Sequence, residues 1–189
     1  MENQKSKSNW QSFWELVRFA LIAIIIVVPI RMFIAQPFIV SGSSMVPTFQ
    51  DGQYLVVDEI SYILGTPKRD DVVVFRDPSN TKIFFIKRII GLPGETVDVK
   101  SDKNEVTITN KEHPNGFKLN QSFIVNTGGI DGHMVLGNNE YYVMGDNRPA
   151  SSDSRYWGVV PKDLMIGRAF LRLLPFSKIS FMPGNYKQN

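Results

Sequence analysis

The stretch DVVVFRDPSNTKIFFIKRII, residues 71–90, decides the fold class of this 189-residue chain. It contains two runs rich in Val, Ile and Phe, residues 71–76 and 83–90, separated by a polar segment with Pro78 and Asn80. β-Branched and aromatic residues favour strands, and Pro, Asn and Asp favour the turns that bound them. We therefore predict a strand in each run.

The same pattern continues through most of the chain after residue 36. Further strands are predicted at 37–41, 54–58, 96–99, 106–109, 122–125, 141–144 and 167–174. Only 61–64 and 161–164 resemble short helical turns. Many strands without intervening amphipathic helices favour a mainly β fold, an antiparallel β-sandwich or barrel-like domain. The more polar stretch of about 100–140 is predicted to be an inserted β-subdomain or a set of long hairpins.

The N-terminal part has a different character. Residues 19–30, FALIAIIIVVPI, are uncharged, and only Glu15, Arg18 and Arg31 interrupt the apolar stretch of 14–34. A membrane span needs about 20 residues, and long basic side chains near its ends can reach the interface. We predict one transmembrane helix over 13–35 after a tail of 1–12. A cleaved signal peptide and a buried core helix remain alternatives.

The distribution of basic residues predicts the orientation of that span. Lys5, Lys7 and Arg18 precede its centre, whereas residues 35–67 contain no Lys or Arg. The positive-inside rule then places the N-terminus in the cytoplasm. The body of the chain, 36–182, is expected on the outer face of the plasma membrane, followed by a C-terminal tail of 183–189.

The composition excludes several classes of protein. The chain has no cysteine, which rules out disulfide scaffolds, thiolate metal sites and cysteine nucleophiles. Its net charge is +3 without a basic run longer than two residues, so nucleic-acid binding is not expected. His113 and His133 stand beside turn residues and are predicted to lie in loops.

The sequence motifs of dinucleotide-binding, phosphate-loop and zinc-protease sites are missing, so we expect neither cofactor nor metal. Ser79 and Lys82 match an S-x-x-K spacing, but its companion motifs are missing, which favours a surface turn.

Three segments have a pattern suited to catalysis. Residues 41–48, SGSSMVPT, form a small-residue turn that exposes hydroxyls, although such a turn alone is usually a linker. In the run 83–90, Lys87 shares a strand face with apolar neighbours, and burial there lowers a lysine pKa from about 10.4 towards neutrality. Such a lysine can act as a general base, whereas the alternative is that Lys87 and Arg88 mark a strand end. Residues 145–158, GDNRPASSDSRYWG, can form a carboxylate–guanidinium clamp or a merely structural loop.

These segments, in this order after an N-terminal anchor, resemble the type I (leader) signal peptidase family. SGSSMVPT resembles its nucleophile box, VVVF at 72–75 a short strand motif, KRIIGLPGE at 87–95 its lysine box, and GDNRPASSDSRYWG its C-terminal signature. The match runs from about residue 13 to 175. Arg69, Asp70 and Asp71 stand before the VVVF strand where the family has Gly-Asp, a departure that we interpret as structural.

The resemblance implies a Ser/Lys dyad serine protease with the following site residues. Ser44 is the nucleophile, Lys87 is the general base, and Ser151 orients the lysine. The supporting polar network contains Asp153, Arg155, Asp146 and Arg148, and the nucleophile loop contains Gly42, Ser43, Met45 and Pro47. The Ser44 N–H is expected to donate to the oxyanion. Gly42 stands where some members have a serine that adds a second donor, so a backbone group or water replaces it or the oxyanion hole is weaker.

The implied activity is that of a membrane-bound endopeptidase. It removes N-terminal signal peptides from secreted preproteins after a small-x-small motif, and the substrate docks by strand addition beside Ser44. The expected partners are preproteins and the lipid bilayer, with no cofactor. Two alternatives stay open: a non-catalytic, membrane-anchored peptide-binding β domain, and a Ser/Lys self-cleaving regulator, which would have a DNA-binding domain in place of the anchor.

Overall fold

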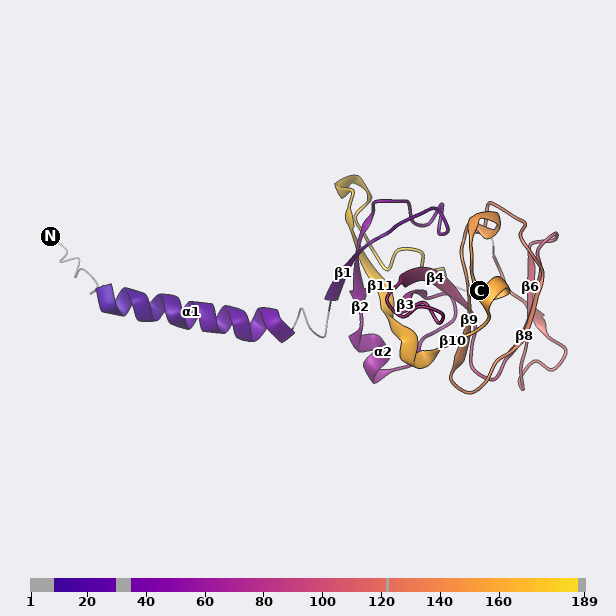
Figure 1. Cartoon of the computed structure of the whole chain (residues 1–189), viewed down its shortest axis with the longest axis horizontal. Helices are drawn as coiled ribbons and strands as arrows, with labels where there is room; N and C mark the ends of the chain where they lie inside the picture. The colour runs from indigo at the N-terminus through magenta and orange to yellow at the C-terminus, as the bar shows by residue number, and fades with distance from the viewer. Residues whose placement is uncertain (1–8, 30–34, 122, 187–189) are drawn as a thin grey trace.

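The computed structural model describes residues 9–29, 35–121 and 123–186, and it divides into a long helix and a β body (Figure 1). The strands are β1 (Ala35–Ile39), β2 (Tyr54–Asp58), β3 (Val72–Arg76), β4 (Phe84–Gly91), β5 (Thr96–Lys100), β6 (Glu105–Thr109), β7 (Phe117–Lys118), β8 (Gly132–Val135), β9 (Glu140–Met144), β10 (Val160–Pro161), β11 (Met165–Leu174) and β12 (Ser180–Phe181). The α-helices are α1 (Asn9–Pro29), α2 (Ile60–Leu64) and α3 (Ser154–Trp157), and the 3₁₀ turns are η2 (Arg148–Ala150), η3 (Lys162–Leu164) and η4 (Phe176–Lys178).

The larger sheet has the strand order β1-β2-β11-β3-β4-β9-β10 among the described residues, with β12 paired to β11. All its pairings are antiparallel, which confirms the predicted mainly β, antiparallel class. The stretch of 71–90 forms β3 and β4, which pair with each other near the middle of this sheet. Strand β4 is therefore supported on both edges, by β3 and by β9.

A smaller sheet, in the order β7-β6-β5-β8, overlaps the polar stretch of about 100–140. Val97 and Ile108 of this sheet pack with Tyr142 of β9, so the two sheets share a core. Arg69 reinforces the junction, because its Nη2 lies 2.6 and 2.7 Å from the two carboxylate oxygens of Glu95. The arginine that departs from the family pattern thus joins the two sheets.

Two local predictions are wrong. Residues 123–125 form no strand, and Ser122 lies outside the described residues. The Ile124 N–H instead closes a turn onto the Gln121 carbonyl at 2.9 Å, and the Phe123 ring stacks on Tyr186. His133, expected in a loop, lies in β8, because residues 132–135 pair with the edge of β5.

Helix α1 lies apart from the β body (Figure 1) and exposes large apolar side chains, among them Trp14, Phe19 and Ile25. Among the residues that the structure describes, no helix combines the length and the apolar content that crossing a membrane requires. Residues 30–34 of the predicted span, and the tail residues 1–8 and 187–189, lie outside the described residues.

Candidate active site

The loop that follows β1 is anchored in the core at two positions. Met45 and Phe49 are fully buried and pack with Leu55. The Val40 N–H donates to the Gln53 carbonyl at 2.9 Å, which holds the two ends of the loop together. Gly42 lies in the left-handed region, with φ at +90°, where a side chain would be strained. Its N–H donates to Asp51 Oδ1 at 2.7 Å.

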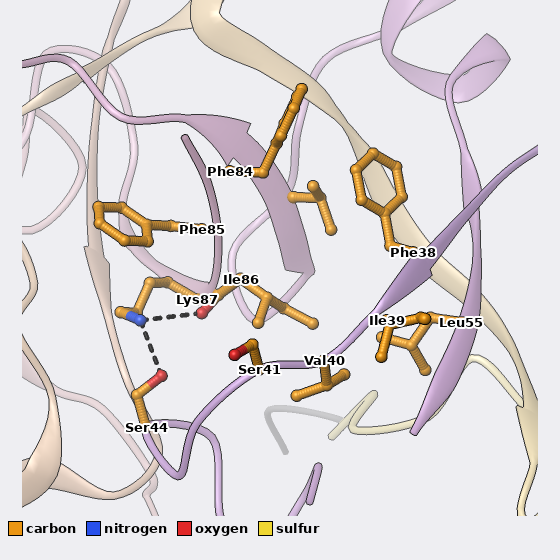
Figure 2. A pocket seen from close by; sticks show the side chains of 11 residues that line it. Phe38, Ile39, Val40, Ser41, Ser44, Leu55, Phe84, Phe85, Ile86 and Lys87 are labelled. Atoms are coloured by element: carbon orange, nitrogen blue, oxygen red, sulfur yellow. Dashed lines mark hydrogen bonds between the residues drawn. The ribbon is translucent and has the colours of Figure 1, made fainter. Parts of the chain in front are cut away.

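Ser44, at the tip of this loop, meets Lys87 of β4. Lys87 Nζ lies 2.8 Å from Ser44 Oγ and 3.1 Å from the Ile86 carbonyl (Figure 2). The Lys87 side chain is buried in the middle of the sheet, opposite Val73 in the register. The structure therefore brings together the two residues that the sequence predicts as nucleophile and base.

Burial lowers the pKa of Lys87 to about 8, although the negative charges of Asp153 and Asp146 act in the opposite direction. A charged amine loses its hydration when it is buried, so the neutral form is favoured. With this pKa, Lys87 is neutral in about a tenth of the molecules at pH 7 and in about half at pH 8. It can accept a proton there, which an exposed lysine rarely does.

A mostly apolar pocket opens beside the pair (Figure 2). Its lining comes from β1, β2, β3, β4 and the nucleophile loop: Phe38, Ile39, Val40, Ser41, Ser44, Leu55, Val74, Phe84, Phe85, Ile86 and Lys87. The rings of Phe38 and Phe84 meet edge to face, with centroids 5.5 Å apart. The pocket is therefore suited to small apolar groups.

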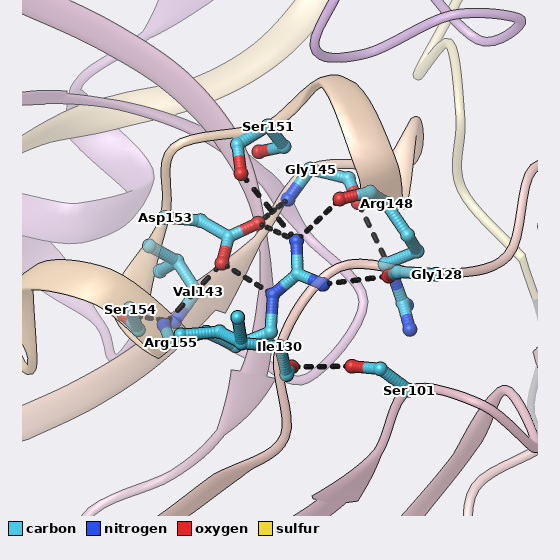
Figure 3. A network of polar contacts seen from close by, with 10 residues as sticks. All are labelled: Ser101, Gly128, Ile130, Val143, Gly145, Arg148, Ser151, Asp153, Ser154 and Arg155. Atoms are coloured by element: carbon cyan, nitrogen blue, oxygen red, sulfur yellow. Dashed lines mark hydrogen bonds and ion pairs between the residues drawn. The ribbon is translucent and has the colours of Figure 1, made fainter.

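The segment after β9 is held by a buried ion pair (Figure 3). Arg155 Nε and Nη2 each lie 2.8 Å from a carboxylate oxygen of Asp153. The Gly145 N–H donates to Asp153 Oδ2 at 3.0 Å, and Arg155 Nη2 donates to the Arg148 carbonyl at 2.7 Å. Asp153 and Arg155 thus fasten the loop of 145–155 to the end of β9.

Two other predicted residues of this loop are buried without the expected contacts. Ser151 Oγ has no hydrogen-bond partner among the described residues, so no hydrogen bond joins it to Lys87 here. Arg148 donates from Nε to the Gly145 carbonyl at 3.1 Å, and burial lowers its pKa to about 10. Gly145 itself permits a close approach, because a Cβ there would lie 2.5 Å from the Ser44 carbonyl oxygen.

Asp146 pairs with Arg88, for which the sequence permits a position at the end of a strand. Arg88 Nε and Nη2 lie 2.8 and 2.6 Å from the Asp146 carboxylate, and both side chains are fully buried. Thr48 Oγ1 donates to the same carboxylate at 2.5 Å. The ion pair thereby ties the nucleophile loop to β4.

The C-terminal segment completes the surroundings of Arg88. The Gly184 carbonyl accepts a hydrogen bond from Arg88 Nη1 at 2.5 Å, and the Tyr186 and Phe123 rings lie 5.0 and 4.4 Å from the guanidinium carbon. These contacts were not predicted for residues assigned to a tail. No local sequence pattern indicates them, because Gly184 lies 96 residues from Arg88 along the chain and Phe123 also lies outside its strand.

With this geometry established, comparisons with known proteins identify the family. Residues 13–174 match the model of the family described as signal peptidase, peptidase S26. The chain belongs to this family. A probable signal peptidase I-2 of Synechocystis is 36% identical over 187 residues, which cover 95% of this chain and 82% of the relative. A signal peptidase I of Bacillus amyloliquefaciens is 35% identical over 176 residues, covering 91% and 90%.

A solved structure of the family is also similar. The crystal structure of a signal peptidase I from Enterococcus faecalis is 30% identical to this chain, covers 55% of it and 96% of its own length, and has a TM-score of 0.46.

Proposed function

We propose that this member of the signal peptidase family removes N-terminal signal peptides from secreted preproteins, cleaving after a small-x-small motif with Ser44 as nucleophile and Lys87 as general base. The observation that carries the proposal is the 2.8 Å contact between Ser44 Oγ and the buried Lys87 Nζ beside an apolar pocket. The relatives named signal peptidase I support the substrate class.

The mechanism follows from the two protonation states of Lys87. The neutral amine accepts the Ser44 hydroxyl proton while Oγ attacks the scissile carbonyl. The resulting ammonium then gives this proton to the leaving amine, which leaves an ester on Ser44. A water gives a proton to Lys87 while its oxygen attacks the ester carbonyl. Lys87 then returns this proton to Ser44 Oγ as the ester bond breaks, which releases the acid product and restores both residues. The Ser44 N–H stabilises the oxyanion in both steps.

The supporting residues act on these two groups. The Asp153–Arg155 pair fixes the loop that holds Ser151, and Asp146 links the nucleophile loop to β4 through Thr48 and Arg88. Ser151 orients the Lys87 amine, a role for which its hydroxyl is available because it is buried and bonds to no other group of the described residues. Arg148 braces the same loop through the Gly145 carbonyl.

The pocket and the neighbouring sheet edge suit an extended peptide. Strand β1 is an edge strand of the larger sheet and leads directly into the nucleophile loop. A substrate that adds as a strand there would place its scissile bond at Ser44 and small side chains in the pocket. Gly42, Ser43, Met45 and Pro47 shape the loop that this peptide meets.

Cleavage of a preprotein by the purified protein in detergent tests the proposal. The new N-terminus, read by sequencing, should follow a small-x-small motif, and Ser44→Ala should abolish the product. The control Ser79→Ala removes another hydroxyl, in the β3–β4 turn, and should cleave normally. Cleavage that persists in Ser44→Ala contradicts the nucleophile assignment, and peptide binding without cleavage in the wild type favours a binding domain.

The pH dependence of kcat/KM tests the base in the same assay. Protonated Lys87 cannot accept a proton, so kcat/KM should rise about tenfold per pH unit below a midpoint near pH 8 and level off above it. A profile without an ionisation in this range argues against Lys87 as the base.

The proposal includes the arrangement at the membrane. Residues 1–12 form a cytoplasmic tail, 13–35 a single-pass anchor, 36–182 the catalytic domain with its insertion at about 100–140, and 183–189 the C-terminal end. The apolar run 19–30, the exposed apolar side chains of α1 and the lack of Lys and Arg in 35–67 support this arrangement. Protease added outside intact spheroplasts should digest the catalytic domain, and its complete protection there would overturn the orientation.

A further inference from the structure

Asn147 fixes the backbone on both sides of the nucleophile. Its side-chain Nδ2 donates to the Ser43 carbonyl at 3.1 Å, and its own N–H donates to the Ser44 carbonyl at 3.0 Å. The Val46 N–H adds a second hydrogen bond to the Ser43 carbonyl, at 3.1 Å. Two consecutive carbonyl groups of the loop are therefore held in set directions.

The direction of the Ser43 carbonyl determines that of the Ser44 N–H. Both belong to one peptide group, which is planar and trans, so the C=O and the N–H point in opposite directions. Because the Ser43 oxygen faces Asn147, the Ser44 N–H points away from the loop of 145–158. Among the described residues, this N–H donates to no protein acceptor.

We propose that Asn147 is a positioning residue that aims the Ser44 N–H at the oxyanion of the tetrahedral intermediate. The inference rests on the proposed function of Ser44. A hydrogen bond weakens steeply when donor and acceptor are misaligned, so an oxyanion donor must be held in its productive direction before the reaction. The orientation of the Ser44 N–H matters more here because Gly42 has no side-chain hydroxyl that could act as a second oxyanion donor.

A second asparagine, Asn126, in the segment between β7 and β8, orients the Asn147 side chain. Asn126 Nδ2 donates to Asn147 Oδ1 at 3.1 Å, and the two residues form an isolated bridge. An amide whose oxygen is engaged by one partner presents its NH₂ group to the other side. Asn126 thereby sets the orientation in which Asn147 reaches the Ser43 carbonyl.

Kinetics of two alanine variants test this arrangement. Asn147→Ala removes the Nδ2 donor and keeps the backbone N–H, so kcat should fall about 10- to 100-fold, less than the 10²- to 10³-fold effect of losing an oxyanion donor outright. The KM should stay near the wild-type value. Asn126→Ala should lower kcat in the same way, but by no more than about tenfold. Asn110→Ala is the matched control, because it removes an amide donor to Glu95 at the end of the smaller sheet and should leave kcat unchanged.

A second readout separates positioning from mere structural support. A peptide aldehyde forms a tetrahedral adduct with Ser44 that carries an oxyanion, whereas a non-cleavable peptide binds without one. The aldehyde affinity should fall by the same factor as kcat/KM in both variants, while the affinity of the peptide and the midpoint of the pH profile stay constant.

Three outcomes would overturn the proposal. They are an unchanged kcat in both asparagine variants, equal losses of aldehyde and peptide affinity, and a loss in Asn110→Ala as large as in Asn126→Ala. If Asn147→Ala does not fold, Asn126→Ala decides alone. Failure of the proposed function looks different, because the wild type would then not cleave or Ser44→Ala would remain active.

Discussion

Lys87 and Arg88 are neighbours on β4, yet the Lys87 side chain contacts neutral groups and the Arg88 side chain contacts a carboxylate. Both are buried, with 4% and 0% of their surface exposed. Lys87 contacts a hydroxyl and a carbonyl, and its nearest hydrogen-bonding groups are neutral. Arg88 makes two short contacts with the Asp146 carboxylate, and its guanidinium lies close to the stacked rings of Phe123 and Tyr186.

The difference shows how one strand carries a titratable cation and a permanent one. Burial destabilises the ammonium of Lys87 and lowers its pKa, so its proton can be exchanged during the reaction. A guanidinium is never deprotonated in proteins, so Arg88 keeps its charge and holds Asp146 and, through it, Thr48. Lysine is suited to the position where a proton must be exchanged, and arginine to the position where a carboxylate must be held in place.

The largest change in stability is expected from breaking the buried ion pair between Arg88 and Asp146. Arg88→Met leaves the Asp146 carboxylate buried without its cation, which should lower the free energy of unfolding by about 3–5 kcal/mol. Denaturant titration measures this loss. Because the Asp146 charge is then unbalanced, it should also raise the pKa of Lys87, and the pH midpoint of cleavage should move upward.

Two further variants sharpen this test. The double variant Arg88→Met/Asp146→Leu replaces the whole pair by apolar side chains and should recover most of the lost stability. Lys118→Met breaks an ion pair with Glu105 that is also short, at 2.7 Å, but solvent-exposed, so it should cost less than about 1 kcal/mol. Equal costs for Arg88→Met and Lys118→Met would contradict the distinction between a buried and an exposed pair.

The two sides of β4 also differ in how far the sequence predicts them. The alternation of the strand indicates that Lys87 is buried among apolar residues, and the predicted limits of β2 agree with the structure. The partner of Arg88 lies 58 residues away, and Gly184 lies 96 residues away, so no local pattern contains them. Alternation alone therefore could not distinguish a paired arginine from one at a strand end.

The errors in the smaller sheet have a related cause. Strands β7 and β8 have only two and four residues, so their pairing to β6 and β5, and not a run of strand-forming residues, makes them strands. Residues 123–125 have the composition of a strand, but Phe123 packs against Tyr186 and Arg88 instead. Asn147 was overlooked for a similar reason, because an asparagine inside a loop gives no sign of which carbonyl it will bind.

A smaller change in stability, of opposite sign, is expected when the Lys87 amine is removed. Lys87→Met removes a buried charge that forms no ion pair with any carboxylate of the described residues, so the variant should be inactive but more stable than the wild type at neutral pH. The folded-state pKa of about 8 lies below the ordinary lysine value of 10.5, so the unfolded state binds the proton more tightly. Wild-type stability should therefore rise with pH between about 8 and 10.5. At 1.36 kcal/mol per pKa unit, the stability advantage of the variant should shrink by about 3 kcal/mol over this range and stay constant below pH 8.

Thermal unfolding at a series of pH values measures this difference, with Lys82→Met, at an exposed position, as a control that should follow the wild type. A Lys87→Met variant that is less stable than the wild type at pH 7 would mean that the ammonium is favourably solvated in the folded protein, and Lys87 and Arg88 would then be alike.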